Sequence, residues 1–398
     1  MQHPLRQQKA DVSDPLSAWH AACERLKALG KQLTEAPFAV DPVGQLEGFE
    51  HLADQLTLWL AWETLHADAT RPFFHRHNDL VSQWGGPNND NTYRHARIDP
   101  DRRYRIVGRM HSCEEFLLAI RAGFMHRPVW GTVAQLTATD HGINEGDDFE
   151  LLLGGDSEGA VELPDSAVMV SIREYYYDWR PLEPATFTIE CLDPEPPAAL
   201  TAAAFETRLA ESLTEIEESM SYWNDYLATN RARRTDNSFA DRTVDVGKGL
   251  AAARYEFCFW DLAADEALVI ECEQPDARYW SAHLYTMHNF EPVDPYGHIS
   301  SRNQRQVEVS ADGRVRFVLS STDPGVRNWL DIAGRRIGLC TLRWFWPHSE
   351  SRPEPLTTVV GVNEVRSLLP ADTATFTPAQ RQSETNARQA HLRWRFRS

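Results

Sequence analysis

The chain has 398 residues, a formal net charge of −18 and a hydrophobic content of 42%. An acidic chain repels the phosphate backbone of nucleic acids, so general nucleic-acid binding is not expected. The apolar content is sufficient for sizeable cores, which argues against a disordered protein, and the length suggests roughly two or three structural units.

The cysteines and the N-terminal residues indicate the cellular compartment in which the protein is expected. Six cysteines are scattered along the chain and no two have C-x-x-C spacing, which argues against a disulfide framework and a zinc ribbon. Free thiols of this kind fit a reducing compartment. Residues 1–10 form no apolar run, and no stretch approaches the roughly 20 apolar residues of a membrane span. We therefore predict a cytoplasmic protein that does not contact a membrane.

Two amphipathic helices are predicted in residues 1–84. Asp14 followed by proline is typical of a helix start, because an N-cap residue often precedes proline at the first helical position. This helix extends to Leu33, and a second is predicted at 46–66, because apolar residues recur at spacings of three and four in both. A turn-rich sequence at 84–91 ends the helical segment.

Residues 85–197 are predicted to form a first β lobe. Alternating polar and apolar positions predict most of its strands, Asp99-Pro100-Asp101 suggests a hairpin turn, and an apolar run at 113–125 predicts one helix. The predicted strands lie at 93–98, 104–109, 129–139, 149–153, 167–179 and 186–192.

A helical segment at 198–265 is predicted to follow this lobe. Residues 202–230 carry an apolar stripe at spacings of three and four, which indicates an amphipathic helix packed against a core. A further helix is predicted at 247–260. These helices would link the first lobe to a second β-rich unit.

The second β lobe is predicted at 266–348, and Asp312-Gly313 marks a hairpin turn within it. The tail at 349–398 is polar and is expected to be loose after Thr377. The strands of the second lobe are predicted at 267–273, 279–287, 304–309, 315–320 and 338–346. We therefore predict an α+β fold with two β-sandwich or jelly-roll-like lobes braced by helices, and a helical N-terminal segment.

One predicted strand, at 168–178, changes character along its length. The residues on one of its faces begin apolar and become polar: Val168, Val170, Ile172, Glu174, Tyr176 and Asp178. This pattern suits a strand that runs from the packed interior of a jelly roll to a wet mouth, although a strand end leaving the core is the alternative. We predict Tyr176 and Asp178 as catalytic residues, and Arg173 and Glu174 as substrate-binding residues.

A second candidate strand, at 279–285, has one apolar face, which is expected to pack in the core. The other face carries only hydrogen-bonding groups: Tyr279, Ser281, His283 and Tyr285. Histidine exchanges protons near neutral pH, and a neighbouring tyrosine hydroxyl can orient a substrate oxygen. We therefore predict His283 as catalytic and Tyr285 as substrate-binding. A solvated face with one satisfied histidine is the alternative.

Familiar cofactor and metal motifs are absent from the sequence. The phosphate-binding loop, the dinucleotide fingerprint, the zincin motif and the nucleophile elbow are not found, so no organic cofactor is expected. The loop after the second candidate strand contains residues of metal-ligand type, but their spacing matches no zinc signature, and no metal is predicted. These residues are His288, Glu291, Asp294 and His298.

Several segments of the second lobe resemble the domain-of-unknown-function-1214 family over about 250–347. They are Tyr279-Trp280-Ser281-Ala282-His283-Leu284-Tyr285, Arg302-Asn303, Asp323-Pro324-Gly325-Val326-Arg327-Asn328-Trp329-Leu330 and Leu342-Arg343-Trp344-Phe345-Trp346-Pro347. Asp90-Asn91-Thr92-Tyr93 and Arg173-Glu174-Tyr175-Tyr176 are similar to the β region that accompanies it. The resemblance implies two β-sandwich or jelly-roll-like lobes with helices between them. Asn303 and Trp329, within these segments, complete the predicted substrate-binding set.

The resemblance names no reaction, because most members have none assigned. Our first hypothesis is a lyase or hydratase without an organic cofactor, acting on a hydrophobic small molecule such as a terpenoid or steroid-like alcohol. Tyr176, Asp178 and His283 would supply the proton donor and base, which requires the two candidate strands to face one cavity. A metal-assisted phosphoesterase is the second hypothesis, because some relatives are reported to act on phosphorylated inositols. A non-catalytic small-molecule carrier or interaction protein is the third, and exposed strand edges would allow a homo-oligomer.

Overall fold

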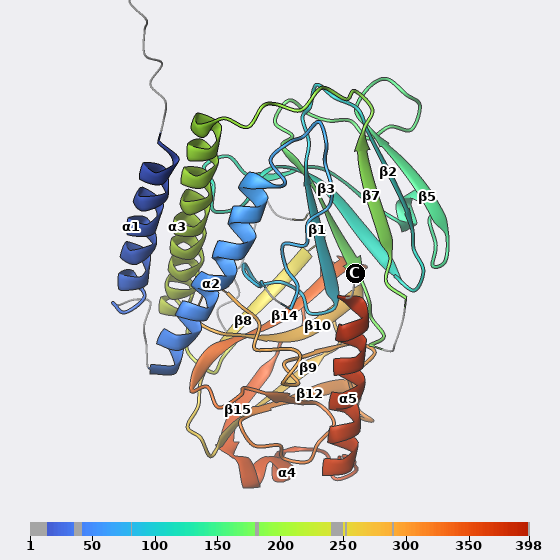
Figure 1. Ribbon diagram of the computed structural model, residues 1–398. Coiled ribbons are helices and arrows are strands. Elements are labelled where there is room, and N and C mark those ends of the chain that lie inside the picture. Colours follow the sequence, from blue (N-terminus) through green and yellow to red (C-terminus); the bar gives the residue numbers. More distant parts are fainter. Residues whose placement is uncertain are drawn as a thin grey trace, which may run out of the picture.

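The computed structural model describes residues 14–35, 42–80, 82–179, 183–239, 250, 253–288 and 290–396. It contains two β-sandwiches, one above the other in Figure 1, with three long helices along one flank and a fourth on the other side. The predicted α+β fold with two sandwich-like lobes and a helical N-terminal segment is confirmed.

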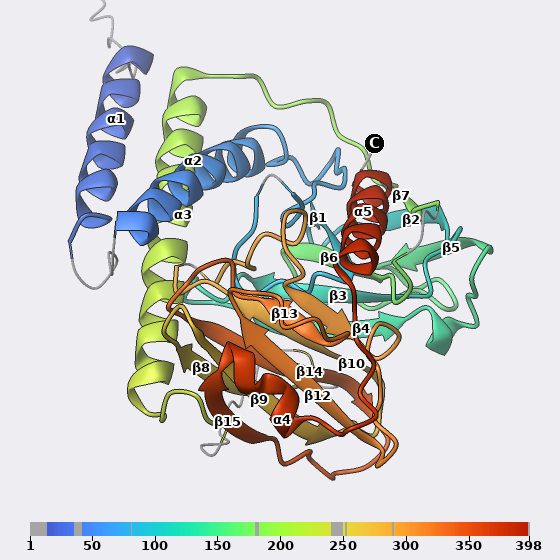
Figure 2. The ribbon, with the colours of Figure 1, turned by 90° about the horizontal axis from the view of Figure 1, so that it is seen from below.

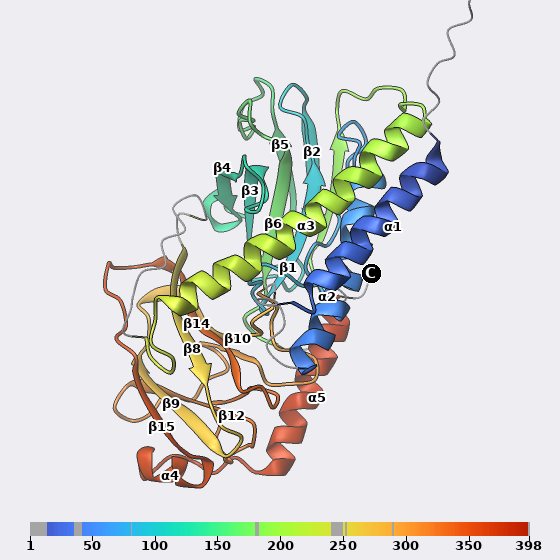
Figure 3. The ribbon, with the colours of Figure 1, turned by 90° about the vertical axis from the view of Figure 1, so that its left-hand side faces the viewer.

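The three flanking helices are α1 (Pro15–Gln32), α2 (Pro42–Thr64) and α3 (Ala202–Ala232). Asp14 caps α1 as predicted, because its carboxylate accepts hydrogen bonds from the backbone N–H groups of Leu16 and Ser17. α3 packs against both α1 and α2, and Figure 3 shows it crossing the flank of both lobes. None of the helices in the described part of the chain is long and apolar enough to cross a membrane.

The first lobe is a sandwich of a four-stranded and a three-stranded sheet, with an apolar core between them. The order of the first sheet is β1 (Asn91–Arg97), β6 (Met169–Tyr175), β3 (Glu115–Gly123) and β4 (Gly131–Thr137). The order of the second is β5 (Asp148–Leu153), β2 (Tyr104–Arg109) and β7 (Thr186–Cys191).

The second lobe is a sandwich of two four-stranded sheets whose core includes Trp260, Trp280 and Trp344. The order of one sheet is β11 (Ser301–Asn303), β10 (Ala277–Tyr285), β14 (Ile337–Pro347) and β8 (Ala253–Asp261). The order of the other is β13 (Trp329–Asp331), β12 (Arg314–Ser320), β9 (Glu266–Glu273) and β15 (Leu356–Gly361). β8 and β15 lie outside the predicted range 266–348 but belong to these sheets.

The helix predicted at 113–125 is wrong, because these residues form strand β3. β3 lies between β6 and β4, and every one of its residues is buried. A strand that is covered on both faces reads as a continuous apolar run, which periodicity cannot distinguish from a buried helix. The prediction therefore assigned a helix to the apolar run Phe116-Leu117-Leu118-Ala119-Ile120, which is a strand.

Three other local predictions are also wrong. The helix at 247–260 is replaced by strand β8, whereas residues 247–249 and 251–252 lie outside the described residues. Asp99-Pro100-Asp101 is not a hairpin, since β1 and β2, which it joins, belong to different sheets. Residues 304–306 form a turn after β11, so the strand predicted at 304–309 is not present there.

The tail after Thr377 is not loose, because it forms helix α5 (Pro378–Arg395). Thr377 and Gln380 make a capping box at its start. α5 lies along the second lobe, and its C-terminal end reaches the first lobe beside β1 and β6 (Figure 2). Its buried face is mostly charged, which conceals it from a search for apolar periodicity.

Close packing of the second sandwich can be tested at Gly338 in β14. A Cβ atom at this position would lie 2.2 Å from Cζ2 of Trp260, so Gly338→Ala is expected to lower the free energy of unfolding by about 1–3 kcal/mol. Urea denaturation measures the change. Gly30→Ala in helix α1 is the control, because its nearest contact is 3.4 Å away and alanine favours a helix. Equal stability of Gly338→Ala and the unchanged protein would contradict the prediction.

Candidate functional site

The polar face of β10 is buried at the junction of the two lobes. Tyr279, Ser281, His283 and Tyr285 are all fully buried, so the alternative of a solvated face is wrong. The opposite face packs in the second lobe's core as predicted. Because β10 pairs with β14 and β11, the polar face is held in a rigid sheet.

A continuous chain of hydrogen bonds runs through this face to a carboxylate of the first lobe. The hydroxyl of Tyr279 lies 2.5 Å from Oδ2 of Asp90 and 2.8 Å from Oγ of Ser281. Oγ of Ser281 lies 2.8 Å from Nε2 of His283. We call Asp90, Tyr279, Ser281 and His283 the junction relay.

Asp90 is a buried carboxylate that is held by donors from several elements. The indole N–H of Trp179 donates to its Oδ1 over 2.7 Å, in addition to the bond from Tyr279. Burial raises the pKa of Asp90, while Tyr279, the positive charge of Arg395 and Trp179 favour its charged form. The relay therefore ends on a carboxyl group whose charge depends on these neighbours.

His283 stands at the other end of the relay with a neutral ring. Burial lowers its pKa well below the ordinary value, and the charges of Arg343 and Arg388 lower it further. Nδ1 of His283 is buried and has no hydrogen-bond partner among the residues that the structure describes. This nitrogen is therefore the atom of the relay that could form a further hydrogen bond or accept a proton.

When Asp90 is ionised, the donors of the relay follow one order outward from its carboxylate. Tyr279 donates its single proton to Asp90, Ser281 donates to Tyr279, and Nε2–H of His283 donates to Ser281. In this order Nδ1 of His283 carries the lone pair and can accept a proton. The positive charge that results on the ring would be stabilised through the chain by Asp90.

Arg343 and Tyr285 extend the site beside the relay. The hydroxyl of Tyr285 donates to the carbonyl of Pro87 over 2.6 Å. Arg343 donates to the same hydroxyl and to the carbonyl of Gly86. The turn-rich segment at 84–91 and the strands of the second lobe, which are far apart in the sequence, therefore meet in one polar site.

Tyr176 and Glu174 lie on the other side of β6, within the core of the first lobe. The hydroxyl of Tyr176 donates to Glu174 over 2.6 Å and accepts from the backbone of Ala185, and Glu174 also accepts from Arg94. Because side chains alternate along a strand, these residues and His283 do not face one cavity. Arg173 and Tyr175 are among the residues on the opposite face of β6, which is turned toward the second lobe.

Asp178 lies in a cleft at the edge of the junction. The cleft has a volume of about 440 Å³ and is lined by both lobes: Ser112, Glu114, Glu145, Tyr177, Asp178, Arg278, Gln304 and Arg305. Tyr177 stacks on Tyr279, with ring centroids 5.3 Å apart. Asn303, a predicted substrate-binding residue, donates a hydrogen bond to the carbonyl of Tyr177 over 2.9 Å. It therefore positions Tyr177, whose ring separates the cleft from the junction relay.

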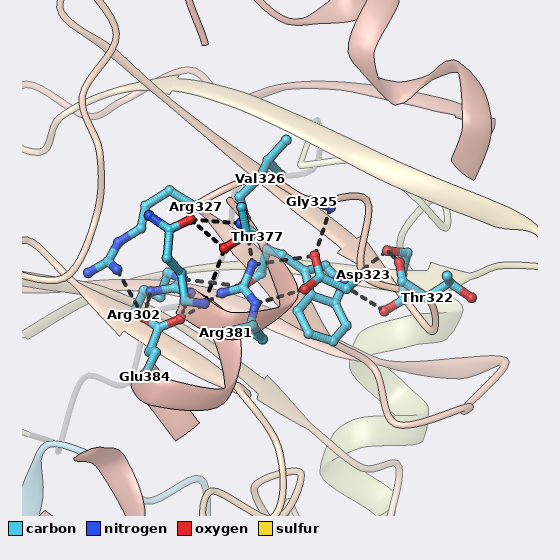
Figure 4. A network of polar contacts seen from close by, with 12 residues as sticks. Arg302, Thr322, Asp323, Gly325, Val326, Arg327, Thr377, Arg381 and Glu384 are labelled. Carbon is cyan, nitrogen blue, oxygen red and sulfur yellow. Dashed lines mark hydrogen bonds and ion pairs between the residues drawn. The ribbon is translucent and has the colours of Figure 1, made fainter. Parts of the chain in front are cut away.

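Trp329 contacts Arg381, which belongs to the network between helix α5 and the second lobe that Figure 4 shows. Its indole N–H donates to the carbonyl of Ser320, and the guanidinium of Arg381 lies 5.0 Å from its ring centroid. Glu384 accepts hydrogen bonds from both Arg302 and Arg381. In this structure Trp329 therefore contacts a helix and not the junction relay.

Helix α5 also covers the relay. Arg388 donates to the hydroxyl of Ser301 over 3.1 Å, and its guanidinium lies 3.9 Å from the ring centroid of Trp179. Arg395 donates to the carbonyl of Asn89. This cover was not predicted, although Arg381, Arg388 and Arg395 recur every seventh residue on one helix face.

The metal-ligand types in the loop after β10 are engaged in structural contacts. Glu291 lies 2.5 Å from Nδ1 of His51, and His298 lies 2.8 Å from Asp331. The carboxylate of Asp294 accepts hydrogen bonds from backbone N–H groups of its own loop. Within the described ranges, no three or more His, Cys, Asp or Glu side chains are grouped so that they could hold a metal ion.

The structure can be compared with solved structures of other proteins. An uncharacterised protein from Burkholderia cenocepacia has a TM-score of 0.79 and 28% identity, and the match covers 87% of this chain and 98% of that one. A protein from Vibrio parahaemolyticus has a TM-score of 0.45 and 13% identity, with coverage of 78% and 98%. No curated protein matches the chain.

The predicted family resemblance is confirmed by a match to a family model. Residues 261–349 match the model described as "Protein of unknown function (DUF1214)". The matched segment contains three members of the junction relay, Tyr279, Ser281 and His283, together with Arg343. Residues 261–349 of this chain are therefore similar to the DUF1214 family of proteins of unknown function.

Proposed function

We propose that the protein is an enzyme of the lyase or hydratase type that works without an organic cofactor. The observation that carries the proposal is the junction relay, in which a buried histidine is linked to a buried carboxylate and one ring nitrogen has no partner among the described residues. General acid–base catalysis needs such a group, positioned by hydrogen bonds and shielded from water.

In an elimination, Nδ1 of His283 would accept a proton from a carbon next to the one that carries a hydroxyl group. The C–H electron pair forms a carbon–carbon double bond, and the hydroxyl leaves as hydroxide. Hydroxide then takes the proton from the histidine to form water, so the base returns to its starting state. Asp90, through Tyr279 and Ser281, offsets the transient positive charge of the ring.

The substrate would be a small molecule with a hydrophobic body, such as a terpenoid or steroid-like alcohol. Aromatic rings from both lobes surround the relay: Tyr175 lies 5.5 Å from Tyr279 and 5.2 Å from Trp346 between ring centroids. Such walls accommodate an apolar body, and the nearby guanidinium of Arg343 supplies a donor for a substrate oxygen.

Replacing His283 by asparagine tests this function. Terpenoid and steroid-like alcohols, and the matching alkenes for the reverse reaction, are incubated with the protein, and loss or gain of water is followed by mass spectrometry. Turnover by the unchanged protein is expected to fall by about 10²–10⁴-fold in His283→Asn, because the general base is removed. His348→Asn, at an exposed position, is the control and should keep full turnover.

Other outcomes of the same assay separate the remaining hypotheses. Equal turnover by His283→Asn and the unchanged protein would refute the role of the relay. Saturable binding of an alcohol without turnover would support a carrier. Release of phosphate from an aryl phosphate that requires a divalent ion and persists in His283→Asn would support the metal-assisted phosphoesterase.

A further inference from the structure

Three arginines between the lobes have no carboxylate partner in the described part of the chain. Arg121, Arg173 and Arg343 project from the facing sides of β3, β6 and β14 and form no ion pair there. Of the other buried arginines, Arg302 pairs with Glu384, whereas Arg388 and Arg395 of α5 form no ion pair with the described residues either. A cation in the interior without a counter-charge is costly, so the missing partners between the lobes need a physical reason.

Hydrogen-bond donors around these arginines also lack acceptors. Nη1 of Arg173, Nε of Arg343 and the hydroxyl of Tyr175 are buried and have no hydrogen-bond partner among the described residues. Burial, together with the neighbouring charge of Arg173, lowers the pKa of Arg121 to about 9. The layer between the two lobes that contains Arg121, Arg173 and Arg343 is therefore rich in hydrogen-bond donors and positive charge.

Tyrosine rings bring Arg173 and Arg343 into one environment. The guanidinium of Arg173 lies 5.6 Å from the ring centroid of Tyr93, and that of Arg343 lies 5.5 Å from those of Tyr255 and Tyr285. The charges of both arginines lower the pKa of Tyr255, which burial raises. Arg173 belongs to the first lobe and Arg343 to the second, so the two guanidinium groups lie near the same hydroxyl. The cleft of about 440 Å³ borders the same layer through Tyr177, which lies beside Tyr175.

We propose that Arg173 and Arg343 bind the oxyanion group, a carboxylate or a phosphate, of a small organic anion whose hydrophobic body lies against the tyrosines. The proposal rests on the proposed function and specifies its substrate: an alcohol that also carries an acidic group, and not a neutral alcohol. Guanidinium groups and a tyrosine hydroxyl are the donors that recognise such oxygens. The missing counter-charge of the layer would then be supplied by the substrate.

Binding of an anion would also act on the relay. The charge of Arg343 is one of the causes that hold the pKa of His283 low. A bound oxyanion beside Arg343 offsets this charge, which raises the proton affinity of His283. The base would therefore become effective when the substrate is in place.

The test uses the full chain with benzoate, phenyl phosphate and neutral benzyl alcohol as probes at constant ionic strength. Calorimetry is expected to show saturable binding of benzoate or phenyl phosphate and none of benzyl alcohol. Arg173→Met should weaken anion binding by at least about tenfold, because a charged hydrogen bond is lost. Preference for benzoate or for phenyl phosphate identifies the oxyanion group.

Arg173→Met separates a binding role from a structural one. Arg173 makes no hydrogen bond or ion pair with the described residues, so its replacement by methionine removes only its contact with the Tyr93 ring and relieves repulsion of Arg121. The variant is therefore expected to have a higher Tm than the unchanged protein while binding anions less tightly. Arg97→Gln is the matched control on β1, because Arg97 is paired with Glu63. It should keep its anion affinity.

Two results would overturn the proposal: no saturable binding of either anion, or a lower Tm with unchanged affinity in Arg173→Met. Histidine signals in NMR spectra give a separate readout, because benzoate should shift those of His283. If His283→Asn binds the anion but turnover does not depend on His283, the proposed function fails and this inference stands. If turnover depends on His283 but only neutral molecules bind, the proposed function stands and this inference fails.

Discussion

Replacement of Asp90 by alanine is expected to lower the free energy of unfolding by about 3–5 kcal/mol. The carboxylate is buried, and both the Tyr279 hydroxyl and the Trp179 indole donate to it. Alanine leaves these donors without the carboxylate acceptor and removes a counter-charge of Arg395. Chemical denaturation followed by circular dichroism measures the loss.

Two variants control for other effects at Asp90. Asp90→Asn keeps an acceptor of the same shape, so its loss of stability should be smaller than that of Asp90→Ala. Asp101→Ala, at an exposed position, should change stability by no more than about 0.5 kcal/mol. If Asp90→Ala were as stable as Asp101→Ala, the buried carboxylate would not stabilise the fold.

Replacement of Glu384 by glutamine is expected to detach helix α5, at a cost of about 3 kcal/mol. Glu384 accepts two hydrogen bonds from Arg302, at 2.7 and 3.0 Å, and a third from Arg381 (Figure 4). Glutamine leaves both buried guanidinium groups without their shared negative charge. Protection of the α5 amides against hydrogen exchange should fall more than that of either lobe.

The same carboxylate predicts a pH dependence of stability. Burial opposes ionisation of Glu384, but Arg302 outweighs it and lowers the pKa to about 2. The unfolded chain has the ordinary value of about 4.3, so the stabilisation is complete above that pH and is lost as pH falls toward 2. Denaturation at a series of pH values should show this loss in the unchanged protein. An equally steep loss in Glu384→Gln would assign it to other groups.

The strand alternation of β10 shows how much the sequence could predict. A period of two separated its apolar face from its polar face, and both assignments of side are confirmed. The same period could not decide between Tyr175, Tyr176 and Tyr177, because β6 is buried on both faces. Which tyrosine meets the second lobe depends on how the two sandwiches stack, and no local pattern contains that information.

Other parts of the fold were hidden for related reasons. Strand β3 has no polar face, so its period could not be recognised. Helix α5 buries charged residues, whose partners, such as Asp323 and Asn89, are far away in the sequence. Asp90 lies in a segment that resembles the family, but its hydrogen bond to Tyr279 spans the two lobes and could be found only in three dimensions.

The charged face of helix α5 has a thermodynamic consequence. Exposure of apolar surface raises the heat capacity on unfolding, whereas exposure of polar surface lowers it. The buried face of α5 consists mainly of polar and charged residues: Arg381, Arg388, His391, Leu392 and Arg395. Release of this helix would therefore show little change in heat capacity but strong sensitivity to salt, unlike unfolding of the tryptophan-rich lobes. Calorimetry at several salt concentrations would resolve it as a separate transition.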